Sequence, residues 1–522
     1  MSPDGKKHPH RVLRWLLVSF GGLLALAGIS AAYLRWFSPF DRAWCVRTLE
    51  KRYEANVELK SFSASLFPVV DIEGEGLVLR RKDQPEAPPL ASVGKFSLNA
   101  LWLNLLRSPR HLGTVRLEGL VLNIPPRRPD QGVAQHGKKQ KHNAAPFVLD
   151  DVVADGTTLN VFSANAQKPP RAFVIEKLRM QSAGTGQPMS FEATLTNPVP
   201  VGEIHSTGKF GPWNADDPSM TPVAGSYSFQ HADLSTIRGL AGILSSEGRY
   251  EGVLSQISVE GKTDTPDFAL GVTGNPVHLK TEFTALVDGV NGDTFLRPVT
   301  AHIGSSTIVA RGGIARTFGS PGRTILLTAV AQSARLEDVL RLAVKQPRPP
   351  MTGSVDVNTS IDIHPGTEDI TKRLKLDGQF AIRSAHFTNA DAERKISGLS
   401  RLGQGRRGDT EIQNVPLDMQ GQFVMAKGLV NFSQLSFSVP GAGVRLHGSF
   451  GLVSQELDFE GEVRLQAKVS QMTTGIKSVL LKAVDPLFAR DGAGMVVPIR
   501  ISGTKTSPSF GIEVGKIFGR GR

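Results

Sequence analysis

Apolar and polar residues alternate along most of this chain with a period of two. In LDFEGEVRLQA, which runs from Leu457 to Ala467, apolar side chains fall on one face and charged ones on the other. Strands that are apolar on one side only are typical of antiparallel sheets, because parallel sheets are usually covered on both faces. The pattern therefore predicts a mainly β protein. The apolar positions that we single out are Leu417, Met419, Phe423, Val444, Leu446, Phe450, Leu457, Phe459, Val463 and Leu465.

Turn residues separate the alternating segments and agree with this prediction. Asp288-Gly289 and Asn291-Gly292 lie between VHLKTEFTALV and TFLRPVTAHI. Asp, Asn and Gly tolerate the positive φ angles that tight turns need. We therefore expect a hairpin-like connection at this point.

Three short stretches have helical spacing. Helices are expected around Asp41 to Glu54 and from Leu336 to Val344. A third is expected from Met472 to Val484. The sequence leaves two roles open for this third helix: a lid packed on the end of the sheet, or contact with a membrane surface, with Lys477 and Lys482 beside its apolar face.

The stretch WLLVSFGGLLALAGISAAYL, from Trp15 to Leu34, contains no charged residue. As a helix rising about 1.5 Å per residue it would span about 30 Å, the thickness of a hydrocarbon core. Trp15, Tyr33 and Trp36 lie at its ends, where amphipathic rings prefer the lipid headgroups. We expect a transmembrane signal anchor over residues 15–35; a cleaved signal peptide is the alternative.

Positive charges lie on both sides of the expected anchor, so their count does not orient it. A short tail followed by a long domain is the usual geometry of a signal anchor, and long domains cross membranes largely regardless of charge. Residues 1–14 are therefore predicted to be a cytoplasmic tail, with the bulk of the chain on the other side of the membrane.

The segment PPRRPDQGVAQHGKKQKHNAAP, residues 125–146, has almost no apolar side chains. It is predicted to be a linker or long loop. Its basic residues are either solvated or attracted to anionic lipid headgroups, at about 1 kcal/mol each near a membrane surface. The headgroup candidates are Arg127, Arg128, Lys138, Lys139 and Lys141.

Composition narrows the classes of protein. The chain has 522 residues, of which 40% are apolar and 21% charged, which excludes wholesale disorder. Its net charge of +12 is dispersed outside the basic segment, and no nucleic-acid recognition motif accompanies it. The single cysteine, Cys45, cannot form an intramolecular disulfide, and no His or Asn arrangement around it suggests a catalytic thiol.

No motif for catalysis, cofactors or metals stands out. The chain has no HExxH and no paired-cysteine motif. Gly403 to Gly408 matches GxGxxG but follows a helix-like stretch instead of a strand, so it is predicted to be a loop. We expect a protein that is not an enzyme and that carries no cofactor or metal.

Several segments occur in a distinctive order. LEKRYEANVELKSFSASLFPVVDIEGEGLVL follows the anchor; LSFSVPGAGVRLHGSF, LDFEGEVRLQAKVSQ and DPLFARDGAGMVVPIRISGTKTSPSFGIEV come near the C-terminus. Together with the anchor, this order resembles the AsmA-like envelope proteins of Gram-negative bacteria. One departure is that Glu54-Ala55-Asn56 stands where a Gly-Arg pair is expected.

The resemblance implies an inner-membrane protein with an elongated, curved antiparallel β-groove in the periplasm, similar to repeating β-groove bridge-like lipid transfer proteins. It implies phospholipid or another acyl-chain lipid as ligand, the ten apolar positions above as candidate groove lining, and a role in outer-membrane biogenesis and lipid homeostasis. It supplies no catalytic residues. The expected regions after the anchor are 36–124 (N-terminal AsmA-like β region), 125–146 (basic linker or loop), 147–350 (middle β-groove) and 351–522 (AsmA-like C-terminal region).

One-sided strands leave an apolar face that something must cover. Ten large apolar side chains left in water would cost about 20 kcal/mol, more than a typical domain's stability. A second sheet or closure into a barrel would cover them, and periodicity alone excludes neither. If acyl chains cover them instead, an aspartate at Phe459 or Val463 is expected to reduce bound lipid without unfolding the domain. The alternative function is an assembly or scaffold factor that influences outer-membrane protein insertion through protein contacts.

Overall fold

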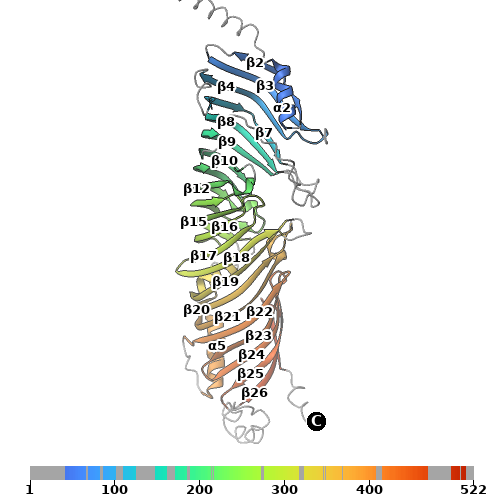
Figure 1. Cartoon of the computed structure of the whole chain (residues 1–522). Helices are drawn as coiled ribbons and strands as arrows, with labels where there is room; N and C mark the ends of the chain where they lie inside the picture. Colours follow the sequence, from blue (N-terminus) through green and yellow to red (C-terminus); the bar gives the residue numbers. More distant parts are fainter. Residues whose placement is uncertain are drawn as a thin grey trace, which may run out of the picture. The chain divides into compact units, whose positions relative to one another are not determined.

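The protein is mainly β, as the alternation predicts (Figure 1). The computed structural model describes residues 41–512 except for short gaps. The gaps are 54, 66–68, 83–85, 102–109, 125–146, 162–170, 185–187, 213, 215–216, 272–274, 317–321, 345, 347, 367, 407–413, 468–494 and 506.

The chain divides into two compact units. The first comprises Met1–Pro198 and Glu203–Tyr227, and the second comprises Val199–Gly202 and Ser228–Arg522. The division falls within β11 (Val201–Phe210) and β12 (Pro222–Asp233), inside the region 147–350 that the sequence suggested as one stretch.

The described part of unit 1 contains one α-helix, the 3-10 turn η2 (Pro218–Met220) and a sheet with both antiparallel and parallel pairs. The helix α2 (Arg42–Tyr53) agrees with the helix expected around Asp41 to Glu54. β3 pairs antiparallel with β1, β2 and β4, and β8 does so with β9, which in turn pairs with β10. The strands are β1 (Ala55–Glu58), β2 (Ser61–Ser65), β3 (Val69–Arg81), β4 (Ala91–Leu101), β5 (Arg110–His111), β6 (Thr114–Glu118), β7 (Val121–Ile124), β8 (Phe147–Val161), β9 (Arg171–Gly184) and β10 (Met189–Pro198).

The prediction of a purely antiparallel sheet is wrong in one part of unit 1. β5, β6 and β7 all pair parallel with β8. Thr114 lies opposite Asp151, and ten positions further along β8 Ile124 lies opposite Val161. The alternation of side chains is the same in both kinds of pairing, so it could not reveal this exception.

Unit 2 is an antiparallel meander in which each strand from β14 to β27 pairs with the next (Figure 1). The strands are β13 (Leu240–Ala241), β14 (Ile243–Val253), β15 (Gln256–Leu270), β16 (Val277–Val287), β17 (Thr294–Ile303), β18 (Ser306–Arg316), β19 (Arg323–Arg335), β20 (Met351–Ile363), β21 (Leu374–Phe387), β22 (Leu417–Ala426), β23 (Leu429–Val439), β24 (Ala442–Gly451), β25 (Glu456–Leu465), β26 (Met495–Thr504) and β27 (Ser507–Ile512).

Short helices interrupt the meander of unit 2. α3 (Leu336–Ala343) confirms the second expected helix, and residues 288–293 connect β16 to β17 as the expected hairpin. α5 (Ala390–Gly403) precedes the GxGxxG segment, as the helix-like stretch there suggested. The third expected helix, around residues 472–484, lies outside the described residues. The remaining helical turns that the structure describes in unit 2 are η3 (Leu234–Thr236) and α4 (Ile370–Arg373).

Two strands of unit 2 carry the same kind of bulge. Pairing shifts between Ala331 and Ala334 in β19, and in β21 the shift is at Ser384. Ser333 and Ser384 both have a φ of +50°, a conformation that costs a side chain about 1–2 kcal/mol. In each case an aspartate of the next strand accepts a hydrogen bond from the serine backbone N–H. A bulge increases the local twist of the sheet.

Among the residues that the structure describes, no helix has the length and apolarity needed to cross a bilayer. The expected anchor at residues 15–35 lies outside those residues, as do its flanking aromatic residues Trp15, Tyr33 and Trp36.

Candidate apolar groove

The strand register of unit 2 brings the ten singled-out apolar positions together on one face. In β24 and β25, Val444 lies opposite Val463 and Phe450 lies opposite Leu457. Phe437 of β23 joins them to β22, because it lies opposite both Met419 and Val444. The intervening charged side chains point to the other face, since successive residues of a strand alternate.

Burial divides the ten positions into two groups. Leu417, Val444, Leu446, Phe459 and Leu465 are at most 7% exposed. The other five are half-buried, and these are Met419, Phe423, Phe450, Leu457 and Val463. The first group therefore belongs to a protein core, and the second lies at a surface that protein covers only in part.

Helices α3 and α5 cover one edge of this apolar face. Ile396 and Leu399 of α5, together with Val339 and Leu340 of α3, pack on a cluster built from one end of the strands β19 to β25. Leu417 is a buried member of this cluster. The helices thus help to bury Leu417 and Leu465, whereas Val444, Leu446 and Phe459 form a second cluster that packs against Leu399 of α5 and against side chains of the sheet.

Local sequence explains where α5 begins and how it docks. The Asn389 side chain caps its first turn by accepting hydrogen bonds from the backbone N–H groups of Asp391 and Ala392. At its other end the Ser400 hydroxyl donates to the carbonyl of Pro440 at 2.8 Å. A Cβ atom on Gly403 would lie 2.2 Å from the carbonyl oxygen of Gly441, so only glycine fits there. The contact brings α5 directly onto the turn between β23 and β24.

A row of phenylalanine rings crosses the apolar face beyond the helices. Ring centroids are 6.3 Å apart for Phe380 and Phe423, 6.4 Å for Phe423 and Phe432, and 5.9 Å for Phe432 and Phe459. Phe380, Phe423 and Phe432 are half-buried, whereas Phe459 is 6% exposed. The row leads from the protein core of unit 2 to its partly open surface.

Glycine makes room for these rings. Gly421 lies opposite Phe380, and a Cβ atom on it would lie 2.7 Å from that ring. Gly448 lies opposite both Phe432 and Phe459 in the neighbouring strands. A ring lying over a glycine covers the backbone of the adjacent strand, so the face is lined by aromatic surface with little backbone exposed.

The described residues supply no second sheet for this face. The strands from β14 to β27 belong to one sheet, and the helices α3 and α5 cover only one end of its strands β19 to β25. The partial exposure of the Phe380, Phe423 and Phe432 rings agrees with this arrangement. An elongated apolar ligand could lie along them without displacing any described element.

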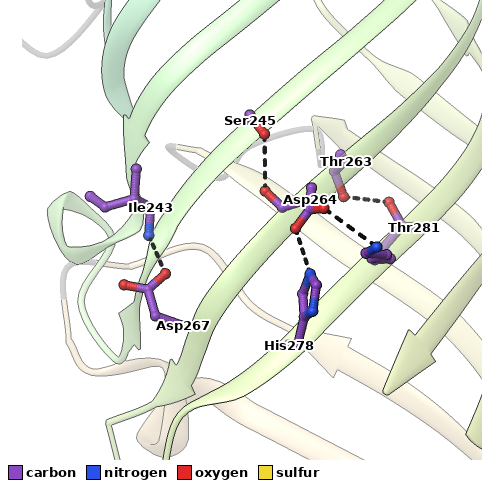
Figure 2. A network of polar contacts seen from close by, with 8 residues as sticks. Ile243, Ser245, Thr263, Asp264, Asp267, His278 and Thr281 are labelled. Carbon is purple, nitrogen blue, oxygen red and sulfur yellow. Dashed lines mark hydrogen bonds and ion pairs between the residues drawn. The ribbon is translucent and has the colours of Figure 1, made fainter. Parts of the chain in front are cut away.

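The lining changes at the beginning of the meander. In β15 and β16 the corresponding face carries Thr263 and Thr281, whose hydroxyls are 2.7 Å apart (Figure 2). On the opposite face, Asp264 contacts His278 at 2.7 Å and the Lys280 ammonium at 3.8 Å. The large apolar side chains are concentrated in later strands, so the best-lined part of the candidate groove is β19 to β25.

The sequence identified the face but not the full row of rings. Phe380 and Phe432 were not singled out, although Phe432 lies between the polar residues Asn431 and Ser433, and Phe380 follows Gln379. Alternation was the available signal for Phe432, but a bulge between Phe432 and Leu435 breaks the period of two in its strand. The burial of Phe459 also changes the expectation for an aspartate at this position, because a charge placed in the core beside Leu399 of α5 would unfold unit 2.

Little reactive chemistry accompanies the groove. Burial raises the pKa of the Cys45 thiol, which disfavours the nucleophilic thiolate. Within the described ranges, no group of three or more His, Cys, Asp or Glu side chains is placed to bind a metal. The headgroup candidates Arg127, Arg128, Lys138, Lys139 and Lys141 lie outside the described residues.

Fold and site define a mainly β protein with a one-sided antiparallel meander and an aromatic apolar lining. Comparisons of this chain with protein-family models, curated proteins and solved structures found no match.

Proposed function

We propose that this protein binds phospholipid through its acyl chains along the apolar face of unit 2 and passes it along that face. The observation that carries the proposal is the row of phenylalanine rings, of which Phe380, Phe423 and Phe432 are half-buried and have no second sheet over them among the described residues. Acyl chains would supply that cover, and burying each large apolar side chain is worth about 2 kcal/mol.

The proposed setting follows from the sequence. The apolar stretch at residues 15–35 would anchor the chain in the inner membrane, with the β units in the periplasm. The resemblance to AsmA-like envelope proteins supports a role in outer-membrane lipid homeostasis. No catalytic group is needed, because an acyl chain makes no directional bonds with an aliphatic or aromatic wall.

The test compares two aspartate variants on adjacent residues of β22. Phe423 belongs to the phenylalanine row, whereas Val424 points to the opposite face and is 40% exposed. We expect phospholipid to copurify with the wild type and with Val424→Asp, and to be largely lost from Phe423→Asp, because a carboxylate beside acyl chains is strongly disfavoured. Mass spectrometry of extracted lipid gives the amount bound per protein.

Circular dichroism and thermal melting of both variants control for folding. Absence of phospholipid from the folded wild type would contradict the proposal. Equal lipid loss in both folded variants would show that the apolar face is not where the lipid binds.

A further inference from the structure

The polar face of unit 2, opposite the phenylalanine row, contains a hollow of about 680 Å³ across β19 to β23. A hollow of about 540 Å³ shares Gln420 and Ser436 with it, and one of about 380 Å³ shares Gln379 and Gln422. A fourth, of about 310 Å³, shares Thr328 with the third. The four hollows therefore form a continuous open trough, running diagonally as expected for a twisted sheet.

Side-chain amides line the centre of this trough in direct register. Asn358 lies opposite Gln379, which lies opposite Gln422, which lies opposite Gln434. All four residues are exposed, and none of their side-chain amides has a hydrogen-bond partner among the described residues. Neighbouring amides are therefore spaced by about 4.8 Å, the distance between strands, and each offers donors and an acceptor.

The centre of the trough is electrically balanced. Among the residues that line the largest hollow, Asp356 is the one with a charged side chain, and Arg383 pairs with it at 2.5 Å. This central hollow attracts neither anions nor cations strongly, although the hollows at the two ends of the trough are lined by both basic and acidic side chains. It suits a neutral ligand that is rich in hydrogen-bonding groups.

An exposed aromatic ring lies near one end of the trough. Phe295 is 57% exposed, on the same face as the amides, and a Cβ atom on Gly313 would lie 3.3 Å from its ring. Gly313 is opposite Leu326, which lines the last hollow. The ring lies over a neighbouring strand and so presents a flat apolar surface to solvent.

We propose that this trough binds a neutral linear oligosaccharide. The unpartnered amides would exchange hydrogen bonds with sugar hydroxyls, and their spacing is comparable with the length of one sugar unit. The Phe295 ring would stack against the apolar face of a sugar at the end of the chain. The site lies on the opposite face from the proposed lipid groove and does not depend on it.

The test is isothermal titration calorimetry of the full chain with three hexasaccharides: chitohexaose, cellohexaose and maltohexaose. The full chain is kept in solution with a detergent that has no sugar headgroup, so that the detergent does not compete for the trough. We expect one of the three to bind with millimolar affinity or better. The double variant Gln379→Ala/Gln422→Ala is expected to weaken binding at least tenfold, because each amide loses its hydrogen bonds to the ligand.

Two control variants define the site. Gln256→Ala removes an exposed amide of β15 outside the trough, and is expected to leave affinity unchanged. Phe432→Asp, in the phenylalanine row on the other face and outside all four hollows, is expected to reduce bound lipid but not sugar affinity. Failure of all three sugars to bind at millimolar concentration, or equal affinity of the wild type and the folded double variant, would overturn the proposal.

Discussion

Single residues hold the bulges of the meander in place. Ser333 and Ser384 adopt positive φ. The backbone N–H of Ser333 donates a hydrogen bond to the Asp356 carboxylate at 2.7 Å, and that of Ser384 donates to Asp418 at 2.8 Å. Without these acceptors the N–H groups would lose their protein partners, because a bulge takes them out of the ladder. The aspartates therefore stabilise the places where the sheet gains twist.

Asp356 makes this stabilisation dependent on pH. The backbone N–H of Ser333, with a further contribution from the Arg383 guanidinium, lowers the pKa of its carboxyl group. The stabilisation is present above the unfolded-state pKa of about 3.9 and is lost as pH falls through the lower folded-state pKa. We expect Asp356→Asn to cost about 1 kcal/mol at pH 7, and progressively less as the pH falls below the unfolded-state pKa and through the folded-state pKa. Urea unfolding across this range measures the difference.

Asp377→Asn is the matched control for this prediction. Asp377 is exposed in the neighbouring strand β21, and its carboxylate accepts no backbone hydrogen bond in the described structure. It is expected to have little effect at either pH. A cost for Asp356→Asn that stays constant down to pH 3 would contradict the assignment.

At the scale of elements, α5 separates covered from uncovered parts of the apolar face. Its apolar side chains Ile396 and Leu399 bury one end of the strands, and its last residue, Gly403, touches the turn after β23. The helix itself could be predicted, because the stretch before Gly403 has helical spacing. Its docking could not, since the pattern of one helix does not say which strands it covers.

Two glycines of α5 provide a test of this docking. A Cβ on Gly403 would collide with backbone, whereas a Cβ on Gly398 would meet nothing within 4 Å. We expect Gly403→Ala to destabilise unit 2 by about 1–3 kcal/mol through overpacking. Gly398→Ala is expected to stabilise it by up to about 1 kcal/mol, because alanine favours helix. Urea unfolding compares them, and similar effects of the two variants would show that the contact at Gly403 is unimportant.

The candidate groove, too, could be predicted only in part, because a sequence pattern does not show which tertiary contacts its residues make. Period-two alternation placed Met419, Phe423 and Val463 on one face correctly, because register in an antiparallel meander preserves the alternation. It could not separate them from Leu417 and Phe459, which α5 and its neighbours bury. Burial depends on tertiary contacts, and the sequence of a single strand does not predict those contacts.

At the scale of the whole molecule, a structural repeat runs along the chain. Ser182, His231, Ser333 and Ser384 share positive φ and a following alanine, at intervals of about 50 residues or twice that. Ala232, Ala334 and Ala385 are at most 2% exposed. This repeat could not be predicted from the sequence, because it consists of a backbone conformation and one small residue, and so leaves no distinctive sequence motif.

The parallel pairing of β7 with β8 in unit 1 fixes a minimum length for the segment that connects these two strands, residues 125–146. β7 ends at Ile124, opposite Val161 at the far end of β8, whereas β8 begins at Phe147. These two ends lie about 46 Å apart at 3.3 Å per strand residue. An extended chain covers about 3.4 Å per residue, so about 14 residues suffice to join them.

Residues 125–146 are therefore longer than connectivity requires, and deletions within them measure the surplus. We expect removal of six residues to leave the thermal melting temperature of the protein unchanged, because the remaining segment still joins the two ends. Removal of twelve residues is expected to lower the melting temperature, because the remaining segment is too short to allow β7 to pair with β8. If the twelve-residue deletion melted like the wild type, β7 and β8 would not be joined in this direction. The length of β8 therefore sets the minimum number of residues between β7 and β8, whatever charge those residues carry.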